Sequence, residues 1–242
     1  MYAGDMTYTP QDIAGRIDHT ILKAEATPGQ VDKIVDEAIA HHFASVCINP
    51  IYVAHVHNRL RGTGVKTCAV AGFPLGASTA SIKAHEAAQA VNHGAEEIDV
   101  VGHLPHLLAA DFEAIKSELS EVVWRVRETR KGIIVKVIVE SALLMLDVDK
   151  KTAESRIETA CRAVREAGAD FIKTSTGFHA TGGATIEAVT LMKKHAGTLK
   201  VKAAGGIRNL DDAVKMLDAG ADRLGCSAGV QIVTGGTAKT SY

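Results

Sequence analysis

Short apolar runs alternate with amphipathic stretches along most of the chain. Eight runs have the length and composition of buried strands, and the stretches between them repeat apolar residues at helical spacing. The runs are RIDHTIL, ASVCINP, VKTCAVAGF, EEIDVVG, GIIVKVIVES, DFIKTST, LKVKAAGG and DRLGCS. Eight strands that alternate with helices predict a closed parallel (β/α)8 barrel, and an open doubly wound sheet is the alternative.

A recurring joint between helix and strand supports this pattern. HGAEEIDVV, AGADFIKTS and AGADRLGCS each close an amphipathic stretch with a glycine, turn, and begin an apolar run. Glycine is favoured where a helix ends because it adopts the left-handed conformation without steric cost. Two helix starts are also recognisable: Thr27 is followed by Pro28 and Gln30, and Asn209 begins a stretch that stops at Gly220.

Two features favour the barrel over the open sheet. No G-x-G-x-x-G motif follows the first strand, and polar residues gather where strands end, which is where a barrel has its active site. Because no linker or low-complexity tract divides the 242 residues, we expect one domain over 1–242. We expect it to have a short N-terminal extension and a flexible C-terminal tail from about 233.

The composition points to a small-molecule partner. Hydrophobic residues make up 46% of the chain, charged residues 23%, and the formal net charge is -1. Neither nucleic acid nor an anionic membrane is therefore an expected partner. The four cysteines have no C-x-x-C spacing, which favours a reducing cytoplasm over a disulfide framework or a zinc site. No stretch has the pattern of a signal peptide or a membrane span.

The stretch DFIKTSTGF ends an apolar run in a lysine. Alternation along strands groups Lys136 with Glu140 and can direct Lys173 and Lys202 into one barrel interior. Strands lie about 4.8 Å apart, so the two ammonium groups repel. Repulsion and desolvation favour the neutral form of one amine, which can attack a carbonyl and form a Schiff base. The alternative is a structural ion pair between Lys173 and a carboxylate.

Two carboxylates lie within apolar runs, Asp99 in EEIDVV and Asp18 in RIDHTIL. A carboxylate close to a charged lysine can relay a proton to a substrate hydroxyl, directly or through water. In the alternative interpretation each carboxylate neutralises a lysine or caps the next helix.

Glycines and hydroxyl residues follow the last three predicted strands. Paired glycines let a backbone approach an anion closely, and a following helix N-terminus adds free N–H groups. A phosphate site after the last strands is a recurring barrel feature, and a set of tight turns is the alternative. The residues are Thr176, Gly177, Gly205, Gly206, Gly225, Ser227 and Gly229.

Histidines and cysteines show no metal-binding pattern. His55 and His57 lie two apart on an expected helix and so face different ways. His103 and His106 lack acidic residues at ligand spacing. Cys47, on a predicted strand, is expected to be a small core residue.

Six motifs occur in the order and approximate spacing of the deoxyribose-phosphate aldolases, and the chain resembles this family over nearly its whole length. They are IDHTIL, VCINP, EEIDVV, FIKTSTGF, KAAGGIR and GCSAG. The resemblance implies a class I aldolase, a lyase that reversibly cleaves 2-deoxy-D-ribose 5-phosphate to D-glyceraldehyde 3-phosphate and acetaldehyde. It also implies chemistry without a metal or organic cofactor, and a homodimer or homotetramer.

The resemblance assigns roles by motif. It implies that Lys173 forms the Schiff base, that Lys202 favours the neutral form of that amine and assists proton transfer, and that Asp99 is the acid/base carboxylate. Asp18 is expected to orient Lys202 from the first strand. The implied substrate neighbours are Thr20 and Cys47, the implied phosphate-binding residues are Gly177, Gly205, Gly206 and Ser227, and Tyr242 matches the tyrosine that ends many family tails.

The chain departs from the family in two places. GHLPHLL follows EEIDVV where an asparagine or aspartate, an apolar residue and glycine are usual, and Cys226 replaces threonine or alanine in GCSAG. Neither change removes a catalytic group. Two other functions stay open: another phosphate-binding barrel enzyme, such as a sugar-phosphate isomerase, and a binding protein that has lost the chemistry.

Overall fold

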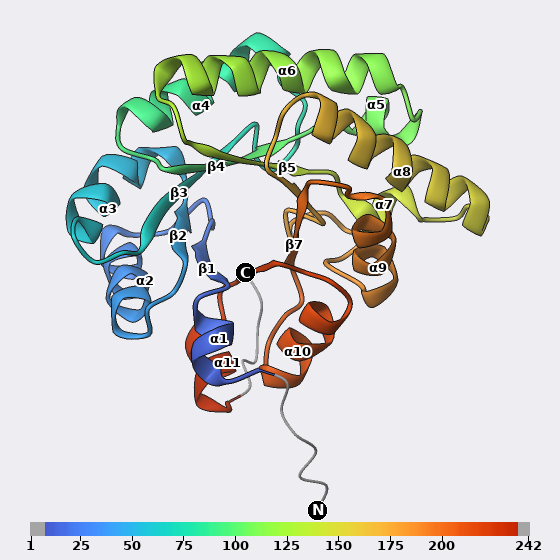
Figure 1. The fold of residues 1–242 in the computed structure, drawn as a ribbon. Helices are drawn as coiled ribbons and strands as arrows, with labels where there is room; N and C mark the ends of the chain where they lie inside the picture. The colour runs from blue at the N-terminus through green and yellow to red at the C-terminus, as the bar shows by residue number, and fades with distance from the viewer. Residues whose placement is uncertain (1–7, 237–242) are drawn as a thin grey trace, which may run out of the picture.

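The chain forms a closed barrel of eight parallel strands (Figure 1). The structure, a computed structural model, describes residues 8–236. Each strand pairs with the next along the chain, and β1 pairs with β8 to close the sheet. The predicted barrel is therefore confirmed, and the open sheet is wrong. The strands are β1 (Ile17–Ile21), β2 (Ser45–Ile48), β3 (Lys66–Ala71), β4 (Glu97–Val101), β5 (Ile134–Ile138), β6 (Phe171–Lys173), β7 (Lys200–Ala204) and β8 (Arg223–Cys226).

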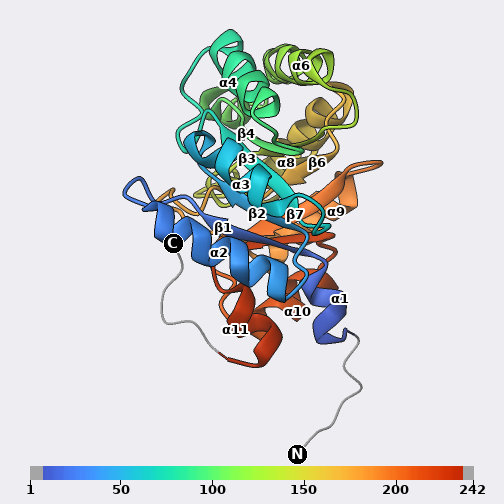
Figure 2. The same cartoon turned by 90° about the vertical axis from the view of Figure 1, so that its left-hand side faces the viewer.

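Helices surround the strands (Figures 1 and 2). The longer ones alternate with the strands, as the sequence pattern predicts, and short helical turns lie in several connections. The helices are α1 (Pro10–Ala14), α2 (Pro28–Ala40), α3 (Val53–Leu60), α4 (Ala80–Asn92), α5 (Leu104–Leu108), α6 (Phe112–Thr129), α7 (Ser141–Leu144), α8 (Lys150–Glu166), α9 (Ile186–His195), α10 (Leu210–Asp218) and α11 (Gly229–Thr234), with a 3-10 turn at Pro50–Tyr52.

The predicted caps and joints are confirmed. The Thr27 hydroxyl accepts a hydrogen bond from the backbone N–H of Gln30, whose side chain accepts one from the N–H of Thr27. The glycines of the three joints all have left-handed φ angles: 115° at Gly94, 83° at Gly168 and 108° at Gly220. At Gly94 a Cβ would lie 2.4 Å from the ring of His57, so close packing also requires glycine there.

The apolar core lies between the strands and the helices, while the barrel interior is largely polar. Outward positions such as Val46, Ile98 and Val137 are fully buried in one cluster with helix side chains. Barrels of this type are usually filled by branched aliphatic side chains. Here the interior holds several buried charged residues, with a small apolar group that includes Cys47 and Cys68. An interior of this kind is a candidate site.

The last described helix leads to the C-terminal end of the chain. Helix α11 continues through Thr234 and is capped by Gly235 with φ 77°. Tyr242, the expected tail contribution, lies outside the described residues. Among residues 8–236, no helix is both long enough and apolar enough to cross a membrane.

Candidate active site

A network of charged side chains fills the interior of the barrel. Its members are almost all fully buried and come from six of the eight strands. Three carboxylates face four cations, so full ionisation leaves one excess positive charge inside the barrel. The residues are Asp18, Glu97, Asp99, Lys136, Lys173, Lys202 and Arg223.

Lys173 and Lys202 meet at one carboxylate oxygen. They occupy paired positions on β6 and β7. The Nζ atom of Lys173 lies 2.8 Å from Asp99 Oδ2, and that of Lys202 lies 2.7 Å from the same oxygen. The repulsion predicted from the sequence did not include a carboxylate shared by the two ammonium groups. The Asp99 carboxylate offsets their repulsion.

The second oxygen of Asp99 is equally occupied. Oδ1 lies 2.8 Å from Lys136 Nζ and accepts a hydrogen bond from the Cys68 thiol at 3.3 Å. Burial raises the pKa of Asp99, but the charges of Lys136, Lys173 and Lys202 outweigh burial and hold that pKa well below its usual value. Asp99 is therefore a carboxylate throughout the neutral pH range.

Lys202 is held from two sides. Its Nζ atom lies 2.5 Å from Asp18 Oδ2, and Asp18 Oδ1 contacts Arg223 at 2.6 Å and the hydroxyl of Ser45 at 2.7 Å. Burial lowers the pKa of Lys202, but Asp18 and Asp99 more than offset this and raise it above its usual value. Lys202 is thus a charged residue in direct contact with Asp18, the residue that the resemblance implies would orient it.

Three members of the network were missed as site residues. Lys136 Nζ lies 2.6 Å from Glu97 Oε2, and Arg223 Nη1 lies 3.4 Å from the same oxygen. Strand alternation carries the signal for two of them, because Glu97 is two residues before Asp99 and Lys136 lies in an otherwise apolar strand. For Arg223, at the start of the last strand, no comparable signal exists.

Two of the loops that form the predicted phosphate site lie close together. Gly177, Gly205 and Gly206 have left-handed φ angles of 82°, 84° and 84°. A Cβ on Gly205 would lie 3.0 Å from Ser175 Oγ and 3.4 Å from the Cα of Gly177, so these backbones approach closely. Close approach is one requirement of a backbone anion site.

Other residues of the predicted phosphate site make contacts within the protein instead. The backbone N–H of Thr176 donates to Glu140 Oε1 at 2.8 Å, so it does not point to a phosphate. A Cβ on Gly225 would lie 2.9 Å from Lys202 Cε, and one on Gly229 would lie 2.9 Å from His19 Nδ1. Close packing against neighbouring side chains therefore accounts for these two glycines. Ser227 lies between β8 and α11.

Thr20 and Cys47 lie side by side on β1 and β2 in the barrel interior. Thr20 is buried, and its hydroxyl donates to the carbonyl of Asp18 at 2.8 Å. Cys47 is the strand partner of Cys68, and a hydrogen bond between the thiols lowers the pKa of Cys47 although burial opposes the shift. Both residues therefore belong to the interior that also contains the lysines.

Within residues 8–236, one set of metal-type ligand atoms clusters: those of Cys47, Cys68 and Asp99 lie within 4.8 Å of one another. Two of the three already contact Lys136 Nζ, at 3.4 Å from Cys68 Sγ and 2.8 Å from Asp99 Oδ1. An ammonium group in this position competes with a metal cation. The cluster is accordingly better described as part of the charge network.

The unusual loop after Asp99 forms α5 and packs on a second buried ion pair. Lys83 Nζ lies 2.6 Å from Glu118 Oε1, and the backbone N–H of His103 donates to Glu118 Oε2 at 3.3 Å. His106 Nδ1 lies 3.9 Å from the same oxygen. The histidines therefore have an acidic neighbour from α6, which local sequence spacing does not reveal.

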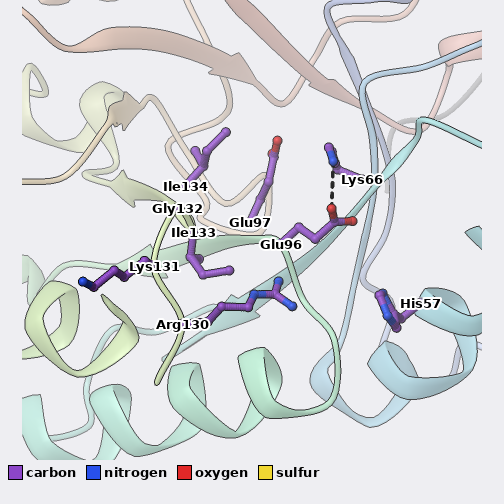
Figure 3. Close-up of a pocket in the computed structure, with 9 residues that line it drawn as sticks. All are labelled: His57, Lys66, Glu96, Glu97, Arg130, Lys131, Gly132, Ile133 and Ile134. Carbon is purple, nitrogen blue, oxygen red and sulfur yellow. Dashed lines mark hydrogen bonds and ion pairs between the residues drawn. The ribbon is translucent and has the colours of Figure 1, made fainter. Parts of the chain in front are cut away.

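A surface cavity lies at the end of the barrel where β3, β4 and β5 begin, opposite the end that bears the glycine loops (Figure 3). Its polar side chains are largely paired: Lys66 Nζ lies 2.8 Å from Glu96 Oε1, and Arg130 donates to the carbonyl of Ala95. Glu97 lines the cavity and also contacts Lys136 inside the barrel. The cavity thus abuts the lower end of the charge network, remote from the strand ends that bear the glycines.

The closed barrel and its interior of lysines and carboxylates place the chain among the (β/α)8-barrel enzymes. Residues 13–235 match the sequence model described as DeoC/LacD family aldolase. The chain belongs to this aldolase family.

Curated relatives and solved structures agree with this assignment. A deoxyribose-phosphate aldolase of Staphylococcus epidermidis is 46% identical over 227 residues, which cover 93% of this chain and 97% of the relative. One from a Thermoanaerobacter species is 47% identical over 223 residues, or 92% of this chain and 96% of the relative. The structure of an Aeropyrum pernix deoxyribose phosphate aldolase, described as tetrameric, matches with a TM-score of 0.82 and 37% identity, covering 93% of this chain and 91% of that one.

Proposed function

We propose that the chain is a class I aldolase that reversibly cleaves 2-deoxy-D-ribose 5-phosphate to D-glyceraldehyde 3-phosphate and acetaldehyde. The names of the curated relatives supply the substrate. The observation that carries the mechanism is that Lys173 on β6 and Lys202 on the neighbouring strand β7 contact the same oxygen of Asp99.

Lys173 is the proposed nucleophile. Among the four interior cations it has the fewest carboxylate contacts, one to Asp99, whereas Lys136 and Lys202 each contact at least two carboxylates. Releasing its proton therefore breaks the fewest ion pairs. The neutral amine attacks C1 of the open-chain sugar and, with loss of water, gives an iminium.

The Asp99 carboxylate has two proposed roles. It lies where it can neutralise the iminium charge at Lys173 Nζ, and it can accept the proton of the C3 hydroxyl through a bridging water. Its low pKa makes it a weak base while three ammonium groups contact it. Conversion of Lys173 to an iminium removes hydrogen-bond donors from Oδ2 and makes that oxygen a better acceptor.

Bond cleavage follows from the iminium. The C2–C3 electron pair moves toward the iminium nitrogen, the C3 carbon becomes the aldehyde of glyceraldehyde 3-phosphate, and an enamine remains on Lys173. Protonation of C2, to which Lys202 can supply the proton through water or Asp99, and hydrolysis then release acetaldehyde and the free amine. Asp18 holds Lys202 in position throughout.

The far end of the substrate is assigned to the glycine backbones. We propose that Gly177, Gly205 and Gly206 hold the phosphate through backbone N–H groups, with Ser227 as a further contact, while Thr20 and Cys47 border the sugar. The close approach of the Gly177 and Gly205 backbones supports this assignment.

Two measurements on one sample test the proposal. Wild-type protein should release acetaldehyde from 2-deoxyribose 5-phosphate in a coupled assay, and borohydride added with acetaldehyde should attach a two-carbon fragment to the peptide that contains Lys173. Lys173→Met should abolish both, with the exposed Lys200 unlabelled in either protein. Activity without an adduct would show that the Schiff-base assignment is wrong. Turnover of other sugar phosphates without inactivation would indicate an isomerase, and affinity without turnover a binding protein.

Two further proposals concern the oligomeric state and the cellular location. Because the Aeropyrum pernix relative is described as tetrameric, we propose that this chain forms a homodimer or homotetramer, which light scattering of the full chain measures directly. We also propose a cytoplasmic location, because all four cysteines are free and buried, as a reducing compartment keeps them.

A further inference from the structure

Glu140 combines two costly features at the end of β5. Its backbone is left-handed, with φ 50° and ψ 59°, a conformation uncommon for residues other than glycine, asparagine and aspartate. Its side chain is 1% exposed. Strained backbone and buried carboxylates persist where the surrounding structure compensates for them, and they gather at functional sites.

The carboxylate of Glu140 holds the loop that follows the proposed Schiff-base lysine. Oε1 accepts a hydrogen bond from the backbone N–H of Thr176 at 2.8 Å. Oε2 is buried and has no hydrogen-bond partner among the residues that the structure describes. The Thr176 contact is therefore the polar interaction that fixes this side chain.

Backbone hydrogen bonds also join the segment around Glu140 to the segment that follows Lys173. The N–H of Val139 donates to the carbonyl of Lys173 at 3.1 Å, and the N–H of Ser141 donates to that of Thr174 at 2.8 Å. The pairing of β5 with β6 ends at Lys173. Beyond that point, the hydrogen bond to the Glu140 side chain still connects the two segments. It reaches Thr176, the residue directly before Gly177.

Thr176 shapes the turn with both of its local polar groups. Its N–H is taken by Glu140, and its hydroxyl accepts from the backbone N–H of Phe178 at 3.1 Å. Gly177 lies between these two anchored positions with φ 82°. The direction of the Gly177 backbone relative to Lys173 therefore depends on the bond from Thr176 to Glu140.

We propose that Glu140 is a positioning residue for the phosphorylated end of the substrate. By holding Thr176 it sets the distance between Gly177 and Lys173, and so the affinity for the phosphate, while taking no part in the chemistry at Lys173. The inference rests on the proposed aldolase function.

A matched pair of amide substitutions separates this role from a general structural one. Glu140→Asn suits the left-handed backbone but is one methylene too short to reach Thr176, whereas Glu140→Gln keeps the length and an acceptor oxygen. For Glu140→Asn we expect KM for 2-deoxyribose 5-phosphate to rise about tenfold, as for loss of one buried hydrogen bond, with kcat nearly unchanged. Cleavage of 2-deoxyribose, which lacks the phosphate, should keep its kcat/KM. Glu140→Gln should stay close to wild type with both sugars.

The outcomes that overturn the inference are distinct. Equal loss with both sugars would place Glu140 in the lysine chemistry or the fold, and an unchanged KM in Glu140→Asn would make the Thr176 contact irrelevant. If Glu140→Asn does not fold by circular dichroism, Glu140→Gly, which also suits the backbone, is subject to the same expectations. If wild type cleaves neither sugar, the proposed function fails. Calorimetry with glyceraldehyde 3-phosphate then decides the positioning role, which requires weaker binding in Glu140→Asn than in Glu140→Gln.

Discussion

Lys136 and Asp99 form a buried ion pair across neighbouring strands, with 2.8 Å between Lys136 Nζ and Asp99 Oδ1. They are register partners on β5 and β4, and both are completely buried. Lys136 also contacts Glu97 at 2.6 Å. It thus lies beneath the proposed catalytic groups and supports the carboxylate that they share.

Removal of Lys136 should destabilise the barrel strongly. Lys136→Met removes an ion-pair partner from each of the buried carboxylates of Asp99 and Glu97, and removing one partner of a buried pair costs about 3–5 kcal/mol. The free energy of unfolding in urea measures this. Lys200→Met is the control, because Lys200 is exposed at the start of β7, where its Nζ atom lies 5.7 Å from the centre of the Phe171 ring, and its loss should change stability by no more than about 1 kcal/mol. Equal stability of the two variants would contradict the prediction.

The same network predicts how stability depends on pH. Folding lowers the pKa of Asp18 and Asp99. The contribution of these carboxylates to stability is therefore present above their unfolded pKa of about 4 and is lost as pH falls through their pKa values in the folded protein. Folding raises the pKa of Lys136 and Lys202. The contribution of these lysines to stability is therefore present below their unfolded pKa of about 10.4 and is lost as pH rises through their pKa values in the folded protein. The network's contribution should be constant between about pH 5 and 9.

Lys136→Met should change that pH profile. Lys136 is the cation that lowers the pKa of Asp99 most, so without it the pKa of Asp99 in the folded protein is lowered less. The variant should therefore lose less stability than wild type as pH falls from about 5 to about 2. Urea unfolding across this range, beside wild type, measures the difference. Parallel profiles for the two proteins would mean that Lys136 does not control the ionisation of the network.

The fold could be predicted because its signals are local. Strand alternation, helix caps at Thr27 and Asn209, and the left-handed joints at Gly94, Gly168 and Gly220 each depend on a few neighbouring residues. These signals agree with one another and indicate parallel strands that alternate with helices, whereas the choice of the barrel over the open sheet depended on the missing G-x-G-x-x-G motif and the polar strand ends. Barrel closure through β1 and β8 is a long-range pairing, which the number of strands implied.

The site was less predictable because its interactions connect distant parts of the chain. Lys173 and Asp99 could be selected from their place in apolar runs, but the sharing of one oxygen with Lys202 depends on side-chain packing across β4, β6 and β7. Arg223 reaches Asp18 across the closure of the barrel, and no motif encodes that contact. Glu140 was grouped with Lys136, but its left-handed backbone turns it toward Thr176 instead.

Replacement of Asp99 should stop cleavage without stopping imine formation. Asp99→Asn keeps the shape but removes the charge, and loss of a general acid/base group costs roughly 100- to 10,000-fold in kcat. Because the Lys173 amine itself remains, borohydride with acetaldehyde should still label that residue, although more slowly than in wild type, since Asp99 no longer neutralises the iminium charge. Glu96→Gln is the control, since Glu96 pairs with Lys66 outside the barrel interior and should keep full activity. If Asp99→Asn retains most of its kcat, the acid/base role is wrong.

Gly205 should tolerate a methyl group poorly, for two separable reasons. At φ 84° an alanine is strained by roughly 1–2 kcal/mol, and its Cβ would lie 2.9 Å from the Cα of Gly183 and 3.0 Å from Ser175 Oγ. Gly62, at φ 79° with nothing within 4 Å of such a Cβ, isolates the strain alone. Gly205→Ala should therefore lose about 1–3 kcal/mol more stability than Gly62→Ala, as overpacking does.

The same pair of variants tests the phosphate assignment. Displacement of the Gly205 backbone should raise KM for 2-deoxyribose 5-phosphate several-fold, because backbone N–H groups bind an anion only when correctly placed. Cleavage of unphosphorylated 2-deoxyribose should change much less, and Gly62→Ala should leave both reactions intact. Steady-state kinetics with the two sugars measures this difference. A similar loss with both sugars in Gly205→Ala would remove Gly205 from the phosphate site and assign it to the support of Lys202 on β7.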